Sequence, residues 1–246
     1  MRVGGSADLL RVLLANDFPV LVETWHEAEP GDGLGHYRLL TGYDDATGDW
    51  LAYDSYDASN LVAPEGPYQG IRLAYDDFDA DWQVFNRTYL IIYPPTRGEV
   101  VQRILADHAD AAAMWRAALT TAQQEIARTP DDAFAWFNVG SNLVALDDLP
   151  GAAAAFDRAR TLGLPWRMLW YQFGPFEAYY AMGRYEEVIT LAEATIASGA
   201  DIEELHYWKG LALAAQGQAD LAAAAWRYAL TLNPQYAPAM AALTQF

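Results

Sequence analysis

His36 and Asp54 are the pair of residues whose types and spacing could support acid–base chemistry. His36 follows Gly35 at the start of an alternating apolar stretch, and Asp54 closes the next such stretch. The turn segment DDATGD joins the two stretches, so a hairpin would bring their ends side by side. Asp54 could then accept a hydrogen bond from one ring nitrogen of His36 and leave the other to exchange a proton. Each residue also has an ordinary interpretation, His36 as a strand-edge histidine and Asp54 as a turn residue.

The sequence offers no nucleophile to this pair. It contains no cysteine, which excludes disulfides, thiolate metal sites and a cysteine nucleophile from these 246 residues. Ser6, Ser55 and Ser59 stand in no motif that would activate a hydroxyl group. No glycine-rich phosphate loop is present, and we predict neither a cofactor nor a metal site.

The elements that must position the pair lie in residues 1–95, which have a mixed α and β pattern. Ser6 can cap a helix in ADLLRVLLAND, and strands are expected in PVLVETW, HYRLLTGYD and DWLAYDSY. YDDFDADW has the acids of a helix start, and YLIIY has the composition of a buried strand. Pro94-Pro95 ends this part, because proline stops the strand before it. Residues 99–246 are alanine-rich and helical in period, so we predict two domains, 1–95 and 99–246.

The order of motifs over residues 6–93 resembles the second half of a papain-like cysteine peptidase domain, specifically the bacteriocin-leader (double-glycine) peptidase family. The matching residues are Pro19-Val20, Gly35-His36-Tyr37, Thr41-Gly42-Tyr43-Asp44 and Asp54. The resemblance implies an α+β partial papain-like domain in which His36 and Asp54 occupy the family's catalytic histidine and aspartate positions. In such an enzyme the histidine activates a thiolate and the aspartate orients the imidazole.

The chain departs from this family at the nucleophile. The family's cysteine lies on a helix near the start of its domain, preceded by a glutamine, and neither the helix nor the cysteine is present here. Two explanations remain open: a fragment of a longer protein, or a remnant that only binds. The opening MRVGGSADLLRVLL is typical of mid-domain sequence, which favours the fragment.

The second half repeats itself. Gly140, Ala152, Phe156 and Ala159 recur as Gly210, Ala222, Trp226 and Ala229, an offset of 70 in every case. Gly183 lies 34 residues before Gly217, so the offset is two repeats of 34 plus two residues. This period and these small residues resemble the tetratricopeptide repeat, an all-α array of helical hairpins. We expect units near 133–166, 169–202 and 203–236, a capping helix over 237–246, and a helix or helix pair over 99–129.

The inner groove of such an array is lined mainly by the first helix of each unit. By register, this chain places there a set of aromatic side chains with a few acids nearby. The aromatic positions are Phe134, Phe137, Trp170, Phe173, Tyr180 and Tyr207. They either pack against neighbouring helices or form an apolar groove that binds a peptide, and the sequence leaves both interpretations open.

The composition limits the classes of partner that this chain is expected to bind. The 33 acidic and 15 basic residues give a formal net charge of −18, which would repel nucleic acids and anionic membranes over most of the surface. No apolar run approaches the ~20 residues that span a bilayer, and the first residues lack the apolar core of a signal peptide. We therefore expect a polypeptide partner, no nucleic acid and no membrane span, in the bacterial cytoplasm or exported within a longer protein.

These observations predict a peptidase-like protein with a protein-binding tetratricopeptide array, inactive as a thiol protease in this chain. The alternative is a non-enzymatic scaffold or adaptor, in which the first region is only a folded base for the array. An enzyme requires the missing nucleophile, whereas an adaptor does not. Neither the substrate, the partner nor the oligomeric state follows from the sequence.

Overall fold

The computed structural model describes residues 1–29, 32–57 and 60–245. The chain divides into two compact units, Met1–Asn142 and Leu143–Phe246. The first unit contains an antiparallel sheet with helices, and the second is entirely helical in its described part.

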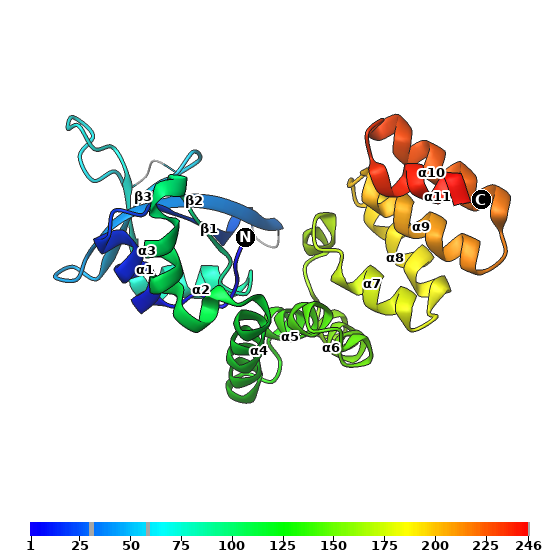
Figure 1. Ribbon diagram of the computed structural model, residues 1–246, viewed down its shortest axis with the longest axis horizontal. Helices are drawn as coiled ribbons and strands as arrows, with labels where there is room; N and C mark the ends of the chain where they lie inside the picture. The colour runs from blue at the N-terminus through cyan, green and yellow to red at the C-terminus, as the bar shows by residue number, and fades with distance from the viewer. Residues whose placement is uncertain (30–31, 58–59, 246) are drawn as a thin grey trace. The chain divides into compact units, whose positions relative to one another are not determined.

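The sheet of the first unit has five strands in the order β4-β3-β2-β1-β5, with every neighbouring pair antiparallel. The two long strands at its centre, β1 and β2, form a hairpin that Figure 1 shows in blue. The strands are β1 Val20–Glu29, β2 Asp32–Asp44, β3 Asp49–Tyr53, β4 Ile71–Ala74 and β5 Tyr89–Ile91. The sequence predicted the segments that form β1, β2, β3 and β5, because each alternates or concentrates apolar residues.

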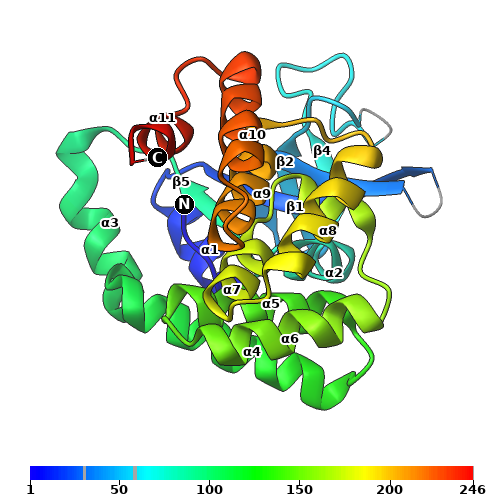
Figure 2. The same cartoon turned by 90° about the vertical axis from the view of Figure 1, so that its right-hand side faces the viewer.

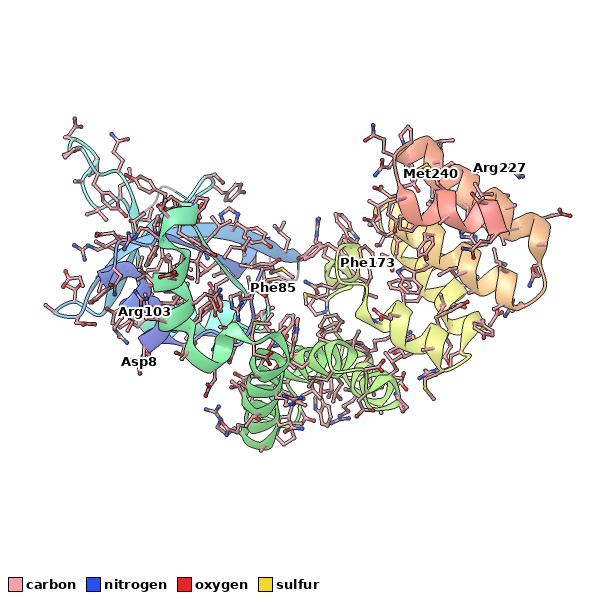
Figure 3. The ribbon with its side chains drawn as sticks, viewed as in Figure 1. Asp8, Phe85, Arg103, Phe173, Arg227 and Met240 are labelled. Atoms are coloured by element: carbon pink, nitrogen blue, oxygen red, sulfur yellow. The ribbon has the colours of Figure 1, made fainter. Side chains whose placement is uncertain are left out.

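Two helices, α1 Ala7–Ala15 and α2 Tyr75–Gln83, pack on the sheet (Figures 1 and 2). The Ser6 hydroxyl caps α1 by accepting the Leu9 N–H at 3.2 Å, as the sequence predicted. The apolar faces of both helices and one face of the sheet form a single core of fully or nearly buried side chains. This core includes Leu10, Leu13, Val20, Val22, Leu40, Trp50, Ala52, Phe78 and Trp82. The opposite sides of the unit's helices carry charge, and Asp8 on α1 and Arg103 on α3 (Gly98–Leu105), both labelled in Figure 3, are 97% and 70% exposed.

The first compact unit continues well past Pro94-Pro95 and includes α3, η2 Ala106–Ala109, α4 Ala111–Arg128 and most of α5 Ala133–Ala145. The turn after α2 explains this extent, because it binds both later helices. Asn86 exchanges amide hydrogen bonds with Asn142 on α5, at 2.7 and 3.3 Å. Arg87 forms an ion pair with Glu125 on α4. The change in composition at the two prolines is therefore not the edge of the compact unit.

The second unit contains an array of helical hairpins, which confirms the all-α repeat architecture at that level. Its elements are α6 Leu149–Thr161, η3 Trp166–Trp170, α7 Gly174–Ala181, α8 Tyr185–Ala197, α9 Glu203–Ala215, α10 Ala219–Leu232 and α11 Ala237–Gln245. Helices α7 and α8 pack as one hairpin and α9 and α10 as the next. Gly183 and Gly217 make the tight turns of these hairpins, with φ angles of +71° and +78° that favour glycine.

Small residues occupy the close helix crossings that the repeat pattern requires. Ala152 and Ala222 are completely buried. A Cβ atom on Gly210 would lie 2.3 Å from Nε1 of the Trp226 indole, so the ring fills the space that glycine leaves open. No helix within the described ranges is long and apolar enough to cross a membrane.

Candidate functional site

The β2–β3 hairpin brings His36 and Asp54 together. Leu39 lies opposite Tyr53 and Leu40 opposite Ala52, so the chain leaving β3 runs beside the first half of β2. Because side chains alternate between the faces of a strand, positions 36, 38 and 40 share one face of the sheet. The His36 Nε2 atom lies 2.8 Å from Asp54 Oδ1. The side chain of His36 is 14% exposed and that of Asp54 is completely buried.

Asp54 is fixed by four hydrogen-bond partners. Besides His36, its Oδ1 atom accepts the backbone N–H groups of Tyr56 at 2.7 Å and Asp57 at 2.8 Å. Its Oδ2 atom accepts the Arg38 Nε–H at 2.7 Å. Every oxygen of this buried carboxylate therefore has a donor, as a buried charge requires.

These donors keep Asp54 ionised. Burial alone would raise the pKa of the Asp54 carboxyl, but the Asp57 and Tyr56 amides, the Arg38 guanidinium and His36 together hold that pKa well below its usual range. A fixed, ionised carboxylate holds one nitrogen of the imidazole and leaves the other, Nδ1, for proton exchange or for a ligand. The pair thus has the contact that an imidazole and its orienting carboxylate need for proton exchange, while the sequence holds no cysteine to supply a thiolate.

Arg38 and Thr24 belong to this site, and the sequence analysis did not find them. The Arg38 side chain is 7% exposed, and its guanidinium donates a second hydrogen bond, at 2.6 Å, to the Thr24 hydroxyl. Thr24 lies opposite His36 in the β1–β2 pairing and donates to the His36 carbonyl at 3.1 Å. The alternation of His36, Arg38 and Leu40 on one face was the available signal, but the β1–β2 register is needed to use it.

His26 on β1 completes the cluster. Its ring centre lies 5.5 Å from that of His36 and 4.8 Å from that of Tyr56, an exposed residue just after β3. The His26 Nε2 atom is buried and makes no hydrogen bond within the described part of the chain. Burial, with the nearby His36 and Arg38, lowers the pKa of His26, so the ring is neutral at pH 7.

The aromatic residues expected in a groove occupy different surroundings. In the first unit, the Phe134 ring packs 5.1 Å from the Trp25 ring of β1, which also contacts Phe85 (labelled in Figure 3). Phe137 is 2% exposed and belongs to the interior. Phe137 therefore presents no free surface to a partner, and Phe134 is half-buried beside Trp25 in the first unit, apart from the aromatic residues of the second unit.

Trp170 and Phe173 precede the first helix of their repeat rather than lying on it. Trp170 ends the 3₁₀ turn η3, and α7 starts only at Gly174, because Pro175 suits the first turn of a helix and restricts the residue before it. The indole N–H of Trp170 donates to the Ser198 hydroxyl at 3.2 Å, and the ring is half-buried. Phe173, labelled in Figure 3, caps α7 and is also half-buried.

Tyr180 and Tyr207 lie in a row of half-buried rings on α7, α9 and the turn before α11. Tyr180 is 6.1 Å from Trp208, which is 5.7 Å from Tyr207, which is 5.8 Å from Tyr236, all measured between ring centres. We call these four residues the aromatic row. Each ring keeps part of its surface exposed to solvent.

Comparison with known proteins gives only distant similarities. No protein-family model matches the sequence, and no curated protein does. Among solved structures, this chain is similar to MamA 41-end from Desulfovibrio magneticus RS-1 and to a MamA RS-1 ArsTM double mutant, each with 20% identity and a TM-score of 0.48. These alignments cover 60% of this chain and 80% and 79% of the two MamA chains. A thermophilic TPR protein of Thermus thermophilus, TTC0263, has 16% identity and a TM-score of 0.44 over 60% of this chain and 87% of its own.

Proposed function

We propose that this chain is a protein-interaction scaffold, and that the aromatic row of its second unit binds an extended polypeptide segment. The observation that carries the proposal is the row itself: four rings in sequence, on α7, α9 and the turn before α11, each partly open to solvent. Half-exposed aromatic side chains are typical of surfaces that bind another protein, because they bury large areas at little cost in conformational entropy.

Acidic side chains beside the row favour a basic partner. Burial, together with the nearby Glu204, Tyr207 and Glu203, raises the pKa of the Tyr236 hydroxyl to about 12. The hydroxyl therefore stays protonated and the two glutamates supply negative charge at one end of the row. A lysine or arginine of the partner would meet ring faces and carboxylates together, which is the arrangement that cation–π contacts need. The net charge of −18 also speeds the approach of a basic segment.

Selection of peptides tests the proposal. Random peptides displayed on phage are selected against the full chain, and the enriched sequences are synthesised and titrated against variants. We expect enrichment of lysine or arginine beside apolar residues, and an affinity at least tenfold lower for Tyr207→Ala. Tyr228→Ala is the matched control, because Tyr228 is exposed on α10 and lies outside the row. Equal binding by both variants, or no enriched sequence, would refute the proposal.

A second candidate function is supported by the 2.8 Å contact between His36 and Asp54. We propose that these residues are the acid–base pair of a peptidase-like site whose nucleophile this sequence does not contain. The purified chain is then expected to leave labelled peptides uncleaved. Cleavage that persists in His36→Ala would indicate a contaminating protease. Cleavage that disappears in His36→Ala would overturn the assignment of an inactive chain.

A further inference from the structure

Two of the chain's four histidines lie side by side on one face of the sheet. Thr24 pairs with His36 and His26 pairs with Leu34, so the histidines stand at diagonal positions of β1 and β2. Their ring centres are 5.5 Å apart and their planes are inclined by 49°. The sequence gives no sign of this proximity, because the two residues are separated by the tip of a long hairpin.

Within the described residues, both rings have a nitrogen without a hydrogen-bond partner. The Nε2 atom of His26 is buried and unpaired. His36 uses Nε2 for Asp54, and its Nδ1 atom makes no hydrogen bond within residues 1–29, 32–57 and 60–245. A buried imidazole nitrogen without a partner costs free energy unless water or a ligand satisfies it.

The separation of the rings fits a shared metal ion. Zinc binds imidazole nitrogens at about 2.0–2.1 Å, and the ring centre lies roughly 1.1 Å beyond the nitrogen, so each centre would stand about 3.2 Å from the ion. Two such rings at the tetrahedral angle have centres about 5.2 Å apart. The observed 5.5 Å differs from this value by less than the movement that a side-chain rotation allows.

Asp54 provides the outer support that metal-binding histidines have. Such a histidine usually donates its second N–H to a carboxylate, which fixes the tautomer and makes the ring a better ligand. His36 has this partner at 2.8 Å, and Asp54 is itself held by Arg38 and two backbone amides. Asp54 is thus fixed in place before any ion binds.

We propose that His26 and His36 bind a divalent transition-metal ion of the zinc class through one imidazole nitrogen each. Groups of three or more histidine, cysteine or acidic ligands are absent from the described residues, so water or a bound molecule completes the coordination. The exposed ring of Tyr56 stands beside the pair, 4.8 Å from His26 and 6.3 Å from His36. This site does not depend on the proposed scaffold function.

Zinc titration of the metal-free full chain tests the proposal by calorimetry. Excess Mg²⁺ is kept in the buffer, because it occupies carboxylate sites on this acidic surface and binds imidazole poorly. We expect one zinc ion per chain, and an affinity at least tenfold lower for His26→Gln and for His36→Ala. A circular-dichroism melt of each metal-free variant identifies any that is unfolded, and His26→Gln, which replaces a ring with no hydrogen bond, is the variant that decides.

His206→Gln is the matched control. His206 also holds a carboxylate, with Nε2 2.7 Å from Asp201 Oδ1, and a tyrosine ring, that of Tyr228, at 4.5 Å. It differs from His36 in having no second histidine beside it. Unchanged zinc affinity in His206→Gln with loss in His26→Gln supports the site. No binding by the parent chain, or equal effects of these two substitutions, would overturn it.

Discussion

Arg38→Leu is expected to destabilise the sheet of the first unit by about 3 kcal/mol. Removing one partner of a buried ion pair costs about 3–5 kcal/mol, because the other charge is left unpaired. Asp54 keeps three donors on Oδ1 and loses only the Arg38 contact on Oδ2, so the lower end of that range applies. Leucine preserves most of the apolar stem, and the loss therefore reports the guanidinium.

Hydrogen exchange measured by mass spectrometry gives the loss of stability of the sheet alone. A local measurement is needed because the chain has two units, which need not unfold in one transition. A loss of about 3 kcal/mol corresponds to roughly a hundredfold lower protection in peptides from β1, β2 and β3. Arg72→Leu is the matched control. Arg72 is 33% exposed and pairs with Asp44 and Asp49 at 3.4 and 3.3 Å, so its removal should cost no more than about 1 kcal/mol.

The pH dependence of the cost of Arg38→Leu provides a second check on the ion pair between Arg38 and Asp54. The pKa of Asp54 is lower in the folded chain than in the unfolded one. The contribution of Asp54 to the free energy of unfolding is therefore fully present above its pKa in the unfolded chain, about 3.9. This contribution is lost as the pH falls through its pKa in the folded chain. The difference between parent and Arg38→Leu should be smaller at pH 3 than at pH 5. A cost no larger than that of Arg72→Leu, or one that grows at pH 3, would refute the reasoning.

Three further predictions concern the second unit and are read from thermal or urea unfolding. Ala222→Leu overpacks a completely buried position and should cost about 1–3 kcal/mol, whereas Ala224→Leu on the exposed side of the same helix should cost almost nothing; equal costs would contradict the assigned crossing. Gly210→Ala should also cost about 1–3 kcal/mol, because its Cβ would lie 2.3 Å from the Trp226 indole, and an unchanged midpoint would contradict that packing. Trp170→Ala should cost less than Trp226→Ala, since Trp170 is half-buried and Trp226 is 1% exposed, and the reverse order would show that η3 is part of the core.

The parts of the fold that the sequence predicted are those set by local pattern. Ser6 caps α1 where the apolar period begins, and the strands that form β1, β2, β3 and β5 follow alternation or apolar runs. The offset of 70 residues located the hairpin α9–α10, and the 34-residue spacing of Gly183 and Gly217 located α7–α8, because each repeat needs small residues at its own crossing and turn. The extent of the first compact unit was not predictable in this way. It depends on the turn at Asn86 and Arg87, whose partners lie on α4 and α5, far along the chain.

The residues of the candidate site also fall into those that local sequence pattern predicts and those that depend on strand pairing. His36 and Asp54 were predicted as a pair from the motifs that flank them, whereas Arg38, Thr24 and His26 required the register between β1 and β2. Trp170 and Phe173 were expected on the first helix of a repeat, and both lie before it. The Gly174-Pro175 pair places the start of α7 after Phe173. The register of the repeats predicted an earlier start because it did not take this local signal into account.

His26 separates the two chemical interpretations of the cluster around His36. A general-base histidine needs an orienting carboxylate and an open nitrogen, and the contact between His36 and Asp54 meets that requirement without His26. The proposed metal site uses the same carboxylate and also a second imidazole about 5 Å away, which His26 provides. Loss of Asp54 or Arg38 would damage both functions and so cannot distinguish them. A neutral replacement of His26 leaves the hydrogen bonds of His36 and Asp54 in place, so its effect on zinc affinity alone assigns the cluster to metal binding.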